Sequence, residues 1–408
     1  PDERGAWLER LASGVEARQE EFARAESLDT GKPLSLAQTV DIPRAVANFR
    51  FFAGAIRHDE SRAFFTQSPA PSAASAAGRA PRSLTYVERH PRGVAACISP
   101  WNLPLYLFSW KIAPALASGN VVIGKPSELS PWTATLLAEV AAEVGFPAGV
   151  LNILHGEGGR VGAPLVAHPS VRAISFTGGT ATGARIASSA APRFVPTSLE
   201  LGGKNATLLF ADHVQPRTAP ASGGVVGSVD PGRLDETLAT IARSAFANQG
   251  QICLCGSRLL VERSIHDAVV EHLTTLVEAR VIGDPLDPAT DHGALISAAQ
   301  LRKVEQYVDL ARSDGGRVVT GGARVEPSTL PERVRGGFFY PPTIVTGLPP
   351  TCRVNQEEIF GPVLSVLPFD TEEEAVGLAN GTVYGLAASV WTRDLDRAHR
   401  VASALEGG

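Results

Sequence analysis

Two residues of complementary chemistry lie in distinctive surroundings: Cys253, in F-A-N-Q-G-Q-I-C-L-C-G-S-R, and Glu200, in L-E-L-G-G-K-N. A free thiol has a pKa of about 8.5, so only a few per cent of it is thiolate at neutral pH. A cysteine that attacks a carbonyl carbon therefore needs a base or a lowered pKa. No His, Lys or Arg directly flanks Cys253, which gives little support to a cysteine hydrolase. The alternative, a buried structural cysteine, suits Cys255 better than Cys253.

Glu200 follows an apolar strand, V-P-T-S-L-E-L, and precedes the pair Gly202-Gly203, which lets the backbone approach a neighbour closely. Burying a carboxylate is unfavourable and raises its pKa toward neutrality, which suits a general base. The sequence therefore predicts that Glu200 is a buried base. The alternative is a surface glutamate on an edge strand.

Asn102 lies in I-S-P-W-N-L-P, directly after a predicted strand. A side-chain amide at the carboxyl end of a strand can donate to an oxyanion. The alternative is a turn asparagine that precedes Pro104.

Several polar turns follow predicted strands and could bind a dinucleotide. Lys125 and Glu128 lie in G-K-P-S-E, and a carboxylate there would accept from both ribose hydroxyls and repel a 2′-phosphate, which favours NAD over NADP. Gly178 and Gly179 open a predicted helix whose first amides could bind the pyrophosphate. The segment around Gly158 only approximates G-x-G-x-x-G, a weak motif in any case. Without further context, each of these turns could equally be a solvated loop.

The segment Q-E-E-I-F-G-P places Glu358 and Phe360 before a Gly-Pro turn. A carboxylate here could hold the nicotinamide ribose, and the aromatic ring could pack on the nicotinamide. Context alone supports this interpretation.

The elements that must position these residues alternate along the chain. Residues 1–57 have the apolar spacing of helices, and from residue 83 short strands alternate with helices. Such alternation is typical of βαβ units, so we expect an α/β fold with a doubly wound, mostly parallel sheet. A second α/β region begins at Leu234, and we expect a domain boundary just after Gly202-Gly203, between a cofactor-binding domain (1–202) and a catalytic domain (203–408). Residues 67–82 and 213–233 are rich in Pro, Gly and small residues and are predicted to be loops.

The composition limits the class of protein. The 408 residues are 44% hydrophobic and carry a net charge of −5, without a basic stripe for nucleic acid or for an anionic membrane. No apolar run reaches the roughly 18 residues of a spanning helix, and the N-terminus does not have the pattern of a signal peptide. Four cysteines without a metal-ligand spacing predict a reducing, cytoplasmic and metal-free protein. The chain lacks methionine and begins at Pro1, which predicts a fragment or a trimmed gene product.

Taken together, the ordered segments P-W-N, G-K-P-S-E, F-T-G, L-E-L-G-G-K-N, N-Q-G-Q-I-C and E-E-I-F-G-P-V resemble the aldehyde dehydrogenase superfamily. The resemblance covers the chain apart from the two predicted loops. It implies an NAD-dependent oxidation of an aldehyde to a carboxylic acid through a cysteine thiohemiacetal and thioester. Cys253 would be the nucleophile and Glu200 the base, while Asn102 and the backbone amide of Cys253 would form the oxyanion hole.

The resemblance also implies which residues contact NAD. Lys125 and Glu128 would hold the adenosine ribose, Gly178 and Gly179 the pyrophosphate, and Glu358 the nicotinamide ribose, with Phe360 beside it. The remaining expected cofactor contacts are Ile98, Pro100, Trp101, Ser127, Gly158, Phe176, Gly183 and Leu201.

Within the superfamily, I-S-P-W-N-L-P-L-Y-L-F-S-W-K-I-A-P and N-Q-G-Q-I-C-L-C are similar to the branch that oxidises 2-aminomuconic and 2-hydroxymuconic semialdehydes in tryptophan (kynurenine) catabolism. Such a substrate carries a carboxylate away from its aldehyde, so an arginine is expected to bind it. Arg50, in A-N-F-R-F-F, matches that expectation, and a surface arginine is the alternative. Other aliphatic or betaine-type aldehydes remain possible substrates.

The sequence departs from the family pattern at several points. Gly179 replaces a usual Ser, Ala206 replaces a frequent Pro, and the two predicted loops are longer. The chain ends at L-E-G-G, where the family continues into a substrate-contacting segment and an oligomerisation strand. We therefore expect a missing C-terminal tail, a strand region for oligomerisation near 82–92, and a homo-oligomer for the full-length protein. An inactive relative with a structural or interaction role is the alternative.

Overall fold

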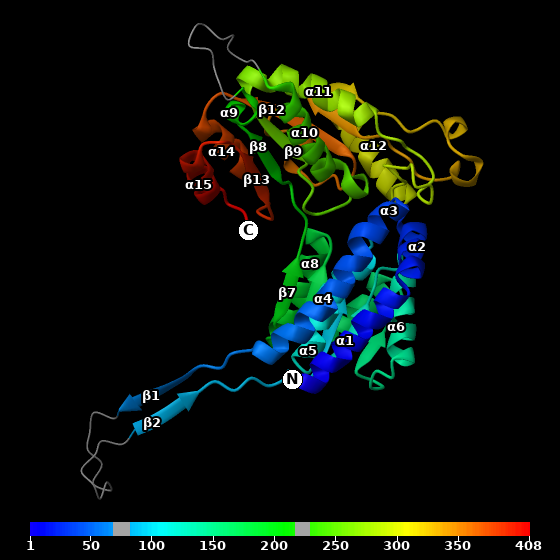
Figure 1. Ribbon diagram of the computed structural model, residues 1–408, viewed down its shortest axis with the longest axis vertical. Helices are drawn as coiled ribbons and strands as arrows, with labels where there is room; N and C mark the ends of the chain where they lie inside the picture. The colour runs from blue at the N-terminus through cyan, green and yellow to red at the C-terminus, as the bar shows by residue number, and fades with distance from the viewer. Residues whose placement is uncertain (68–81, 217–228) are drawn as a thin grey trace, which may run out of the picture.

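The computed structural model describes residues 1–67, 82–216 and 229–408. Most of the two predicted loops, at 67–82 and 213–233, therefore lies outside the described residues. Figure 1 shows two α/β regions joined by a short connection. A narrow two-stranded arm projects from the lower region.

The first sheet has five parallel strands in the order β5-β4-β3-β6-β7. Its strands are β3 (Val94–Ile98), β4 (Val121–Lys125), β5 (Leu151–Ile153), β6 (Val171–Thr177) and β7 (Thr197–Glu200). The chain runs from β3 outward to β5, then returns to the other side for β6 and β7. This arrangement confirms the predicted doubly wound sheet, and its switch point lies between β3 and β6.

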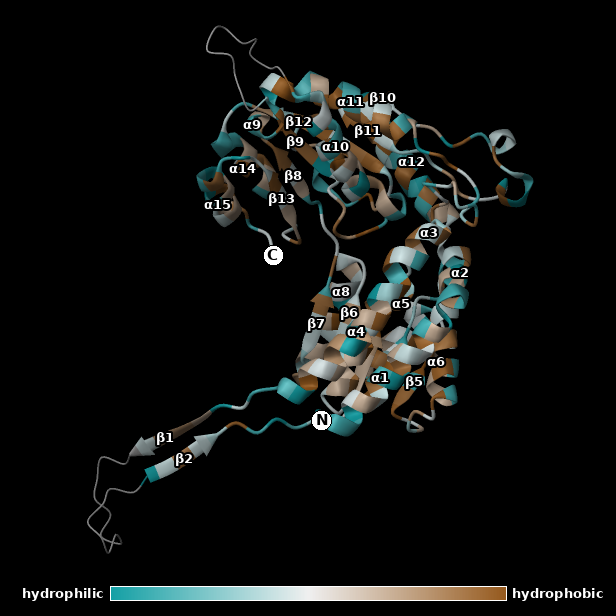
Figure 2. Ribbon diagram, viewed as in Figure 1, coloured by the Kyte–Doolittle hydropathy of each residue, from teal (hydrophilic) through white to brown (hydrophobic). Residues whose placement is uncertain are grey.

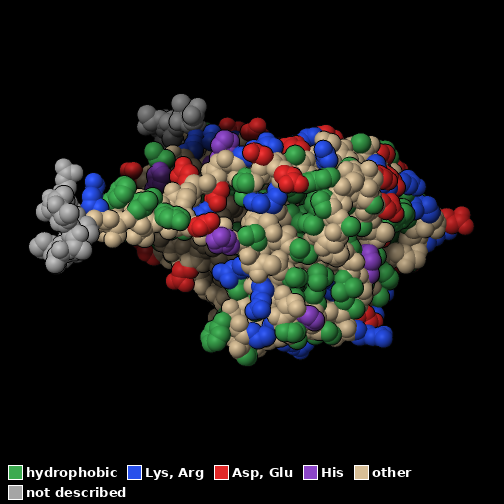
Figure 3. Space-filling model, turned by 90° about the horizontal axis from the view of Figure 1, so that it is seen from below, with side chains coloured by type: hydrophobic (Ala, Val, Ile, Leu, Met, Phe, Trp, Pro, Cys, Tyr) green, Lys and Arg blue, Asp and Glu red, His purple; other side chains and the backbone are tan. Residues whose placement is uncertain are grey.

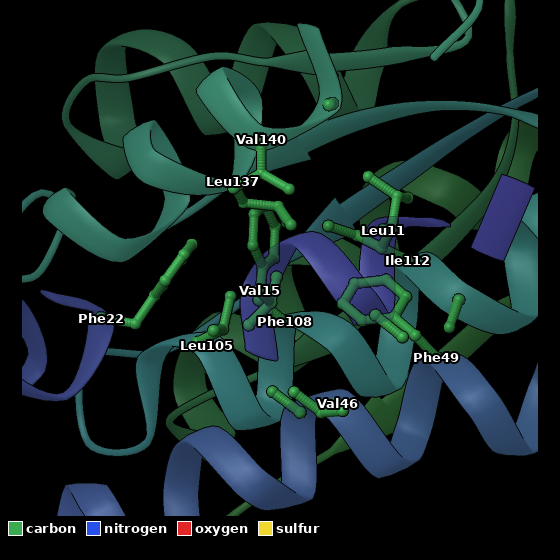
Figure 4. Packing of buried hydrophobic residues seen from close by; sticks show 14 of the residues in the cluster. Leu11, Val15, Phe22, Val46, Phe49, Leu105, Phe108, Ile112, Leu137 and Val140 are labelled. Atoms are coloured by element: carbon green, nitrogen blue, oxygen red, sulfur yellow. The ribbon is translucent and has the colours of Figure 1, made fainter. Parts of the chain in front are cut away.

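Helices cover both faces of this sheet. The N-terminal helices are α1 (Asp2–Ala17), α2 (Gln19–Thr30), α3 (Leu34–Leu36) and α4 (Ile42–Ala55), with a π-helical turn at Ala37–Asp41. The connecting helices are α5 (Pro104–Ala117), α6 (Trp132–Glu143), α7 (Ala163–Ala167) and α8 (Thr180–Ala190). Apolar residues of α1, α4, α5 and α6 interdigitate in one core, where Leu105, Phe108 and Phe49 meet (Figure 4).

The second sheet has six strands in the order β10-β11-β12-β9-β8-β13, and only β10 is antiparallel to its neighbour. Its strands are β8 (Ala206–Leu209), β9 (Arg258–Glu262), β10 (Arg317–Thr320), β11 (Thr343–Thr346), β12 (Val363–Phe369) and β13 (Ala388–Trp391). Its helices are α9 (Ala211–Val214), α10 (Pro231–Phe246), α11 (His266–Glu278), α12 (Ala298–Ser313), α13 (Arg353–Gln356), α14 (Glu372–Asn380) and α15 (Leu395–Ala404). The strands are hydrophobic and the outer helix faces are polar, as expected for a covered sheet (Figure 2).

The projecting arm is an antiparallel pair, β1 (Ala63–Gln67) and β2 (Arg82–Tyr86). The sequence predicted a strand region near 82–92 but not its partner β1. The prediction that residues 67–82 form a loop is therefore wrong at its two ends, because Gln67 pairs with Arg82 inside the arm.

Local predictions were accurate where periodicity was strong. The sequence predicts a helix from Trp132 to Glu143, and α6 has these bounds. It also predicts a helix from Leu234 to Ala247, whereas α10 begins at Pro231, because Asp230 caps it. Among the described residues, no helix is long and apolar enough to cross a membrane, and no group of His, Cys, Asp or Glu side chains could hold a metal ion.

Candidate active site

A cavity of about 430 Å³ lies at the carboxyl ends of β3 and β6, where the topology of the first sheet reverses. Ten of the predicted cofactor residues line it: Ile98, Pro100, Trp101, Lys125, Ser127, Glu128, Gly158, Phe176, Gly178 and Gly179. These residues lie at the carboxyl ends of β3, β4 and β6 and in the π-helical turn Gly158–Gly162 after β5. Separate segments of the first sheet therefore meet at one site, as expected from the strand-end rule.

The chemistry of this cavity fits a dinucleotide. Helix α8 begins at Thr180 after Gly179, whose lack of a side chain leaves the first amides of the helix without a side-chain cap. Such amides attract a pyrophosphate. Lys125 is buried, and its Nζ lies 3.4 Å from Oε2 of Glu128, whose carboxylate remains half exposed at the cavity rim. The amides at the start of α8 can bind two phosphates, and the ammonium group of Lys125 and the carboxylate of Glu128 can hydrogen-bond to a ribose.

A second cavity of about 200 Å³ adjoins the first, because Pro100, Trp101, Gly178 and Gly179 line both. Cys253 lines it, together with residues from the α/β regions around both sheets. Its other predicted lining residues are Asn102, Leu201, Glu358 and Phe360. Gly183 lines neither cavity; it packs against Leu201, because a Cβ added there would lie 2.5 Å from that side chain.

Cys253 lies at the end of a strained turn. Asn248 and Gln249 have positive φ values of 50° and 56°, a conformation that is unfavourable for residues with a side chain and that often marks functional sites. The carbonyl of Cys253 accepts a hydrogen bond of 2.7 Å from Asn205 Nδ2, which fixes the backbone beside the thiol.

The thiol of Cys253 rests in its neutral form. Burial raises its pKa, and the negative charges of Glu358 and Glu200 add to the effect, against weaker stabilisation from backbone amides. A nucleophilic role for Cys253 therefore requires a base rather than a pre-formed thiolate. Cys255 is fully buried, and burial raises its pKa to about 12, which suits packing.

Asn102 is buried and lies next to the cysteine loop. Its Nδ2 donates to the carbonyl of Gln251 at 2.8 Å, and its own carbonyl accepts from Asn248 Nδ2 at 3.0 Å. An amide nitrogen carries two hydrogens, so one remains available to a second acceptor. The structure thus brings Asn102 and Cys253, which are distant in the sequence, onto one cavity wall.

Glu200 differs from the prediction. It is exposed rather than buried, because β7 is the edge strand of the first sheet and Glu200 is its last residue. The carboxylate does not line either cavity, although its charge acts on the thiol of Cys253. Burial is therefore not what would make Glu200 a base.

Glu358 is half-buried and contacts the Gly202-Gly203 turn. Its Oε1 accepts a hydrogen bond of 3.0 Å from the amide of Gly203. A Cβ at Gly202 would lie 2.3 Å from Oε2 of Glu358, so only glycine allows this approach. Burial raises the pKa of Glu358, and the Gly203 amide opposes the shift. Phe360 has a φ of 59° and packs edge-on against Trp101, with ring centroids 5.2 Å apart.

Two residues that the sequence did not single out line the cavity at Cys253. Gln300 donates to the carbonyls of Ile359 and Phe360, at 3.1 and 2.6 Å, and so holds the Phe360 turn. Lys303, one turn along α12, has its pKa lowered by burial, while the charge of Glu358 opposes the shift. Neither belongs to a motif, and their only signal was a shared face of an amphipathic helix.

Arg50 lies outside this cavity. Its guanidinium donates to both oxygens of Glu16 on α1, at 2.9 and 2.5 Å. It lines a different groove of about 520 Å³, which shares no lining residue with the cavity at Cys253. Arg44 and Trp110 line the same groove, and Arg44 forms no ion pair with any described residue.

Comparisons with known proteins agree with this site. The family model "Aldehyde dehydrogenase family" matches residues 1–222 and 224–408, and the chain belongs to this family. It is an aldehyde dehydrogenase, an oxidoreductase whose cofactor is NAD.

Named relatives are similar over the whole chain. The chain is 46% identical to 2-aminomuconic semialdehyde dehydrogenase of Danio rerio over 411 residues, and 47% identical to 2-hydroxymuconic semialdehyde dehydrogenase of Pseudomonas sp. (strain CF600) over 407. Each match covers 100% of this chain and 77% of the relative. The solved structure of an indole-3-acetaldehyde dehydrogenase with NAD⁺ has a TM-score of 0.88 and 40% identity, covering 100% of this chain and 75% of its own.

Proposed function

We propose that Cys253 is the nucleophile, Glu200 the general base and Asn102 the oxyanion donor of this aldehyde dehydrogenase. The observation that carries the proposal is the 200 Å³ cavity, which places Cys253 and Asn102 on one wall and opens into the dinucleotide cavity. The same geometry supports Ile98, Pro100, Trp101, Lys125, Ser127, Glu128, Gly158, Phe176, Gly178, Gly179, Leu201, Glu358 and Phe360 as cofactor contacts.

The chemistry proceeds on the cysteine. Glu200 accepts the thiol proton, and Sγ of Cys253 forms a bond to the aldehyde carbon, whose oxygen takes the negative charge. The free N–H of Asn102 and the amide of Cys253 stabilise that oxygen in the thiohemiacetal. Bound NAD supplies the hydride acceptor. Glu200 first releases the thiol proton to solvent and then accepts a proton from water, whose oxygen attacks the carbon of the resulting thioester. The C–S bond breaks, which releases the carboxylic acid and the thiolate of Cys253.

We propose a muconic semialdehyde, 2-aminomuconic or 2-hydroxymuconic, as the substrate, in tryptophan (kynurenine) catabolism. The named relatives support this class. A substrate of this kind carries a carboxylate, and α4 presents two cations, Arg44 and Arg50, on one groove beside Trp110. Arg50 remains our candidate for the substrate carboxylate, and Arg44 on the same helix is its alternative because it has no carboxylate partner among the described residues.

A kinetic comparison tests both proposals. NADH formation is measured with the two muconic semialdehydes and with a simple aliphatic aldehyde. We expect the muconic substrates to give the higher kcat/KM, and C253A to abolish turnover while NAD still binds. Arg50→Gln is compared with Arg44→Gln. The variant that lacks the arginine that binds the carboxylate is expected to have a raised KM for the muconic substrates only. Turnover retained by C253A would refute the assignment of the nucleophile.

The projecting arm supports a homo-oligomer. An isolated two-stranded ribbon is marginally stable in water and leaves both strand edges unpaired. Phe65 is 64% exposed and Tyr86 62%, and they share one face of the arm with Leu84. Figure 3 shows hydrophobic side chains along the arm next to the residues drawn in grey. We infer that a second copy of this chain covers this face.

Sedimentation analysis tests the oligomer. Leu84→Lys is expected to shift the protein to a smaller species, because it places a charge on the covered face. Ser83→Lys points to the opposite face and is the matched control. An unchanged mass for L84K would exclude the arm as the contact.

Two further expectations remain proposals. The four cysteines are all free, which supports a reducing, cytoplasmic location. The first sheet ends at Glu200 and the second begins at Ala206, which supports a domain boundary at 202/203.

A further inference from the structure

Glu26, Lys32 and Asp41 form a buried ionic cluster beside the start of α5, the helix that follows Asn102. Lys32 Nζ lies 3.2 Å from Oε1 of Glu26 and donates a hydrogen bond to Oδ2 of Asp41. All three side chains are fully buried. Burial alone would lower the pKa of Lys32, but the charges of Asp41 and Glu26 raise it, so Lys32 stays cationic.

The stability of the fold does not explain this cluster. Each buried ion carries a desolvation cost of several kcal/mol, and apolar residues of similar volume often serve at least as well. The cluster also has an unequal balance, with two carboxylates against one ammonium. Burial raises the pKa of Glu26 to about 7, and the charge of Asp41 adds to the shift, while Lys32 and the amide of Leu105 oppose it. The second carboxyl group of the cluster therefore has a polar partner outside the trio.

That partner is the N-terminus of α5. Oε2 of Glu26 accepts a hydrogen bond from the amide of Leu105 at 3.3 Å. Pro104, the first residue of the helix, has no amide hydrogen, and Leu103 at the N-cap supplies no side-chain cap. Leu105 therefore carries the first free amide of α5, and the carboxylate also meets the positive end of the helix dipole.

Asn102 lies three residues before Leu105, on the short turn that enters α5. On its other side, Asn248 and Gln251 of the cysteine loop hold its carbonyl and its side chain. Leu105 itself is buried in the core with Phe22 and Phe108 (Figure 4). The turn is thus fixed at one end by the cysteine loop and at the other by Glu26.

We propose that Glu26, oriented by Lys32 and Asp41, is a positioning residue that caps α5 and so fixes the Asn102 amide relative to Cys253. The inference rests on the proposed oxyanion role of Asn102. Oxyanion stabilisation depends on placement, and a displacement of about 1 Å can reduce a rate by about 100-fold. Loss of the cap would release the helix entry and with it the amide.

The rate of hydride transfer in a single turnover tests the proposal. The NAD-loaded enzyme is mixed with a simple aliphatic aldehyde, and NADH formation is followed. This readout does not depend on the muconic substrate. Glu26→Ala is expected to slow the step about 10- to 100-fold with NAD affinity unchanged. Glu26→Gln keeps an oxygen acceptor for Leu105 and is expected to stay within about 3-fold of the wild type. Val269→Ala, a buried change in α11, controls for a loss of stability and should leave the step unchanged.

A double-mutant cycle separates positioning from general damage. If Glu26 acts through Asn102, E26A should not slow the N102A enzyme further, because the amide it positions is gone. An equal slowing in both backgrounds, or a wild-type rate in E26A, would overturn the proposal. A wild-type rate in N102A would refute the oxyanion role itself and this inference with it. If E26A does not fold, Glu26→Asp replaces it, because the shorter side chain keeps a carboxyl group but withdraws its oxygen from Leu105 by about 1.5 Å.

Discussion

The contact between Gly202 and Glu358 gives a prediction whose size follows from the structure. In Gly202→Ala, the new Cβ would lie 2.3 Å from Oε2, 2.6 Å from Cδ and 2.8 Å from Oε1 of Glu358. Ordinary contacts between nonbonded heavy atoms begin near 3.5 Å, so the carboxylate must retreat by about 1 Å. It then loses its 3.0 Å hydrogen bond from the Gly203 amide.

A hydrogen bond to a charged group contributes about 1.5–3 kcal/mol, which corresponds to about 10- to 150-fold in an equilibrium constant. Since Glu358 is proposed to hold the nicotinamide ribose, we expect G202A to raise the KM for NAD by about 10- to 100-fold. We also expect a loss of about 1–3 kcal/mol in the free energy of unfolding, because the site is overpacked.

Steady-state NADH formation at varied NAD, with thermal unfolding in parallel, measures both effects. Gly377→Ala is the matched control: it lies in α14, and its Cβ would meet no atom within 4 Å. Alanine favours a helix over glycine by about 0.5–1 kcal/mol, so G377A should be slightly more stable with an unchanged KM. If G202A bound NAD as the wild type does, the role of the Gly202–Glu358 contact would be wrong.

Three other changes have expected outcomes. Glu200→Gln should slow thioester hydrolysis more than hydride transfer, so a burst of NADH precedes a slower steady rate; a normal burst with an unchanged steady rate would contradict the role of Glu200. Glu128→Gln should lower the preference for NAD over NADP about 10-fold in kcat/KM, and an unchanged ratio would exclude Glu128 as its source. Burial lowers the pKa of His292 to about 4. Between pH 6.5 and 4 the imidazole is therefore protonated in the unfolded chain but neutral in the folded chain. The free energy of unfolding falls as the pH falls through this window, by about 3 kcal/mol in total. Denaturant titrations of His292→Gln should show a flatter dependence over this window, and a slope equal to that of the wild type would refute the assignment.

Much of the fold could be predicted from local patterns. The first sheet and α6 follow from periodicity, and the grouping of the turns that we propose to contact NAD follows from the rule that ligands bind at the carboxyl ends of parallel strands. The strands β8, β11 and β13 were not predicted, and their length of four residues is not the reason, because β7 is equally short and was predicted. Strand β1 was missed because its register depends on a partner, β2, across a segment rich in proline and alanine.

Burial was the property that local patterns predicted least well. Glu200 follows an apolar segment, yet it is exposed, because β7 has a neighbour on one side only. Arg50, our candidate for the substrate carboxylate, pairs with Glu16, 34 positions earlier, a contact that no local pattern predicted. Both outcomes depend on which elements pack together, and a window of neighbouring residues does not contain that information.

The sequence by itself determined the chemical identities: a cysteine in a glycine-containing turn, an asparagine after a strand, and carboxylates and glycines at strand ends. These follow from short motifs, since each is made by neighbouring residues. Only the tertiary structure decided that Asn102, Cys253 and Glu358 share one cavity, that Lys303 and Gln300 join them, and that Glu26 lies under the Asn102 turn. The physical reason is that hydrophobic packing of the two sheets sets distances between residues more than a hundred positions apart, while local propensity sets only the conformation of each segment.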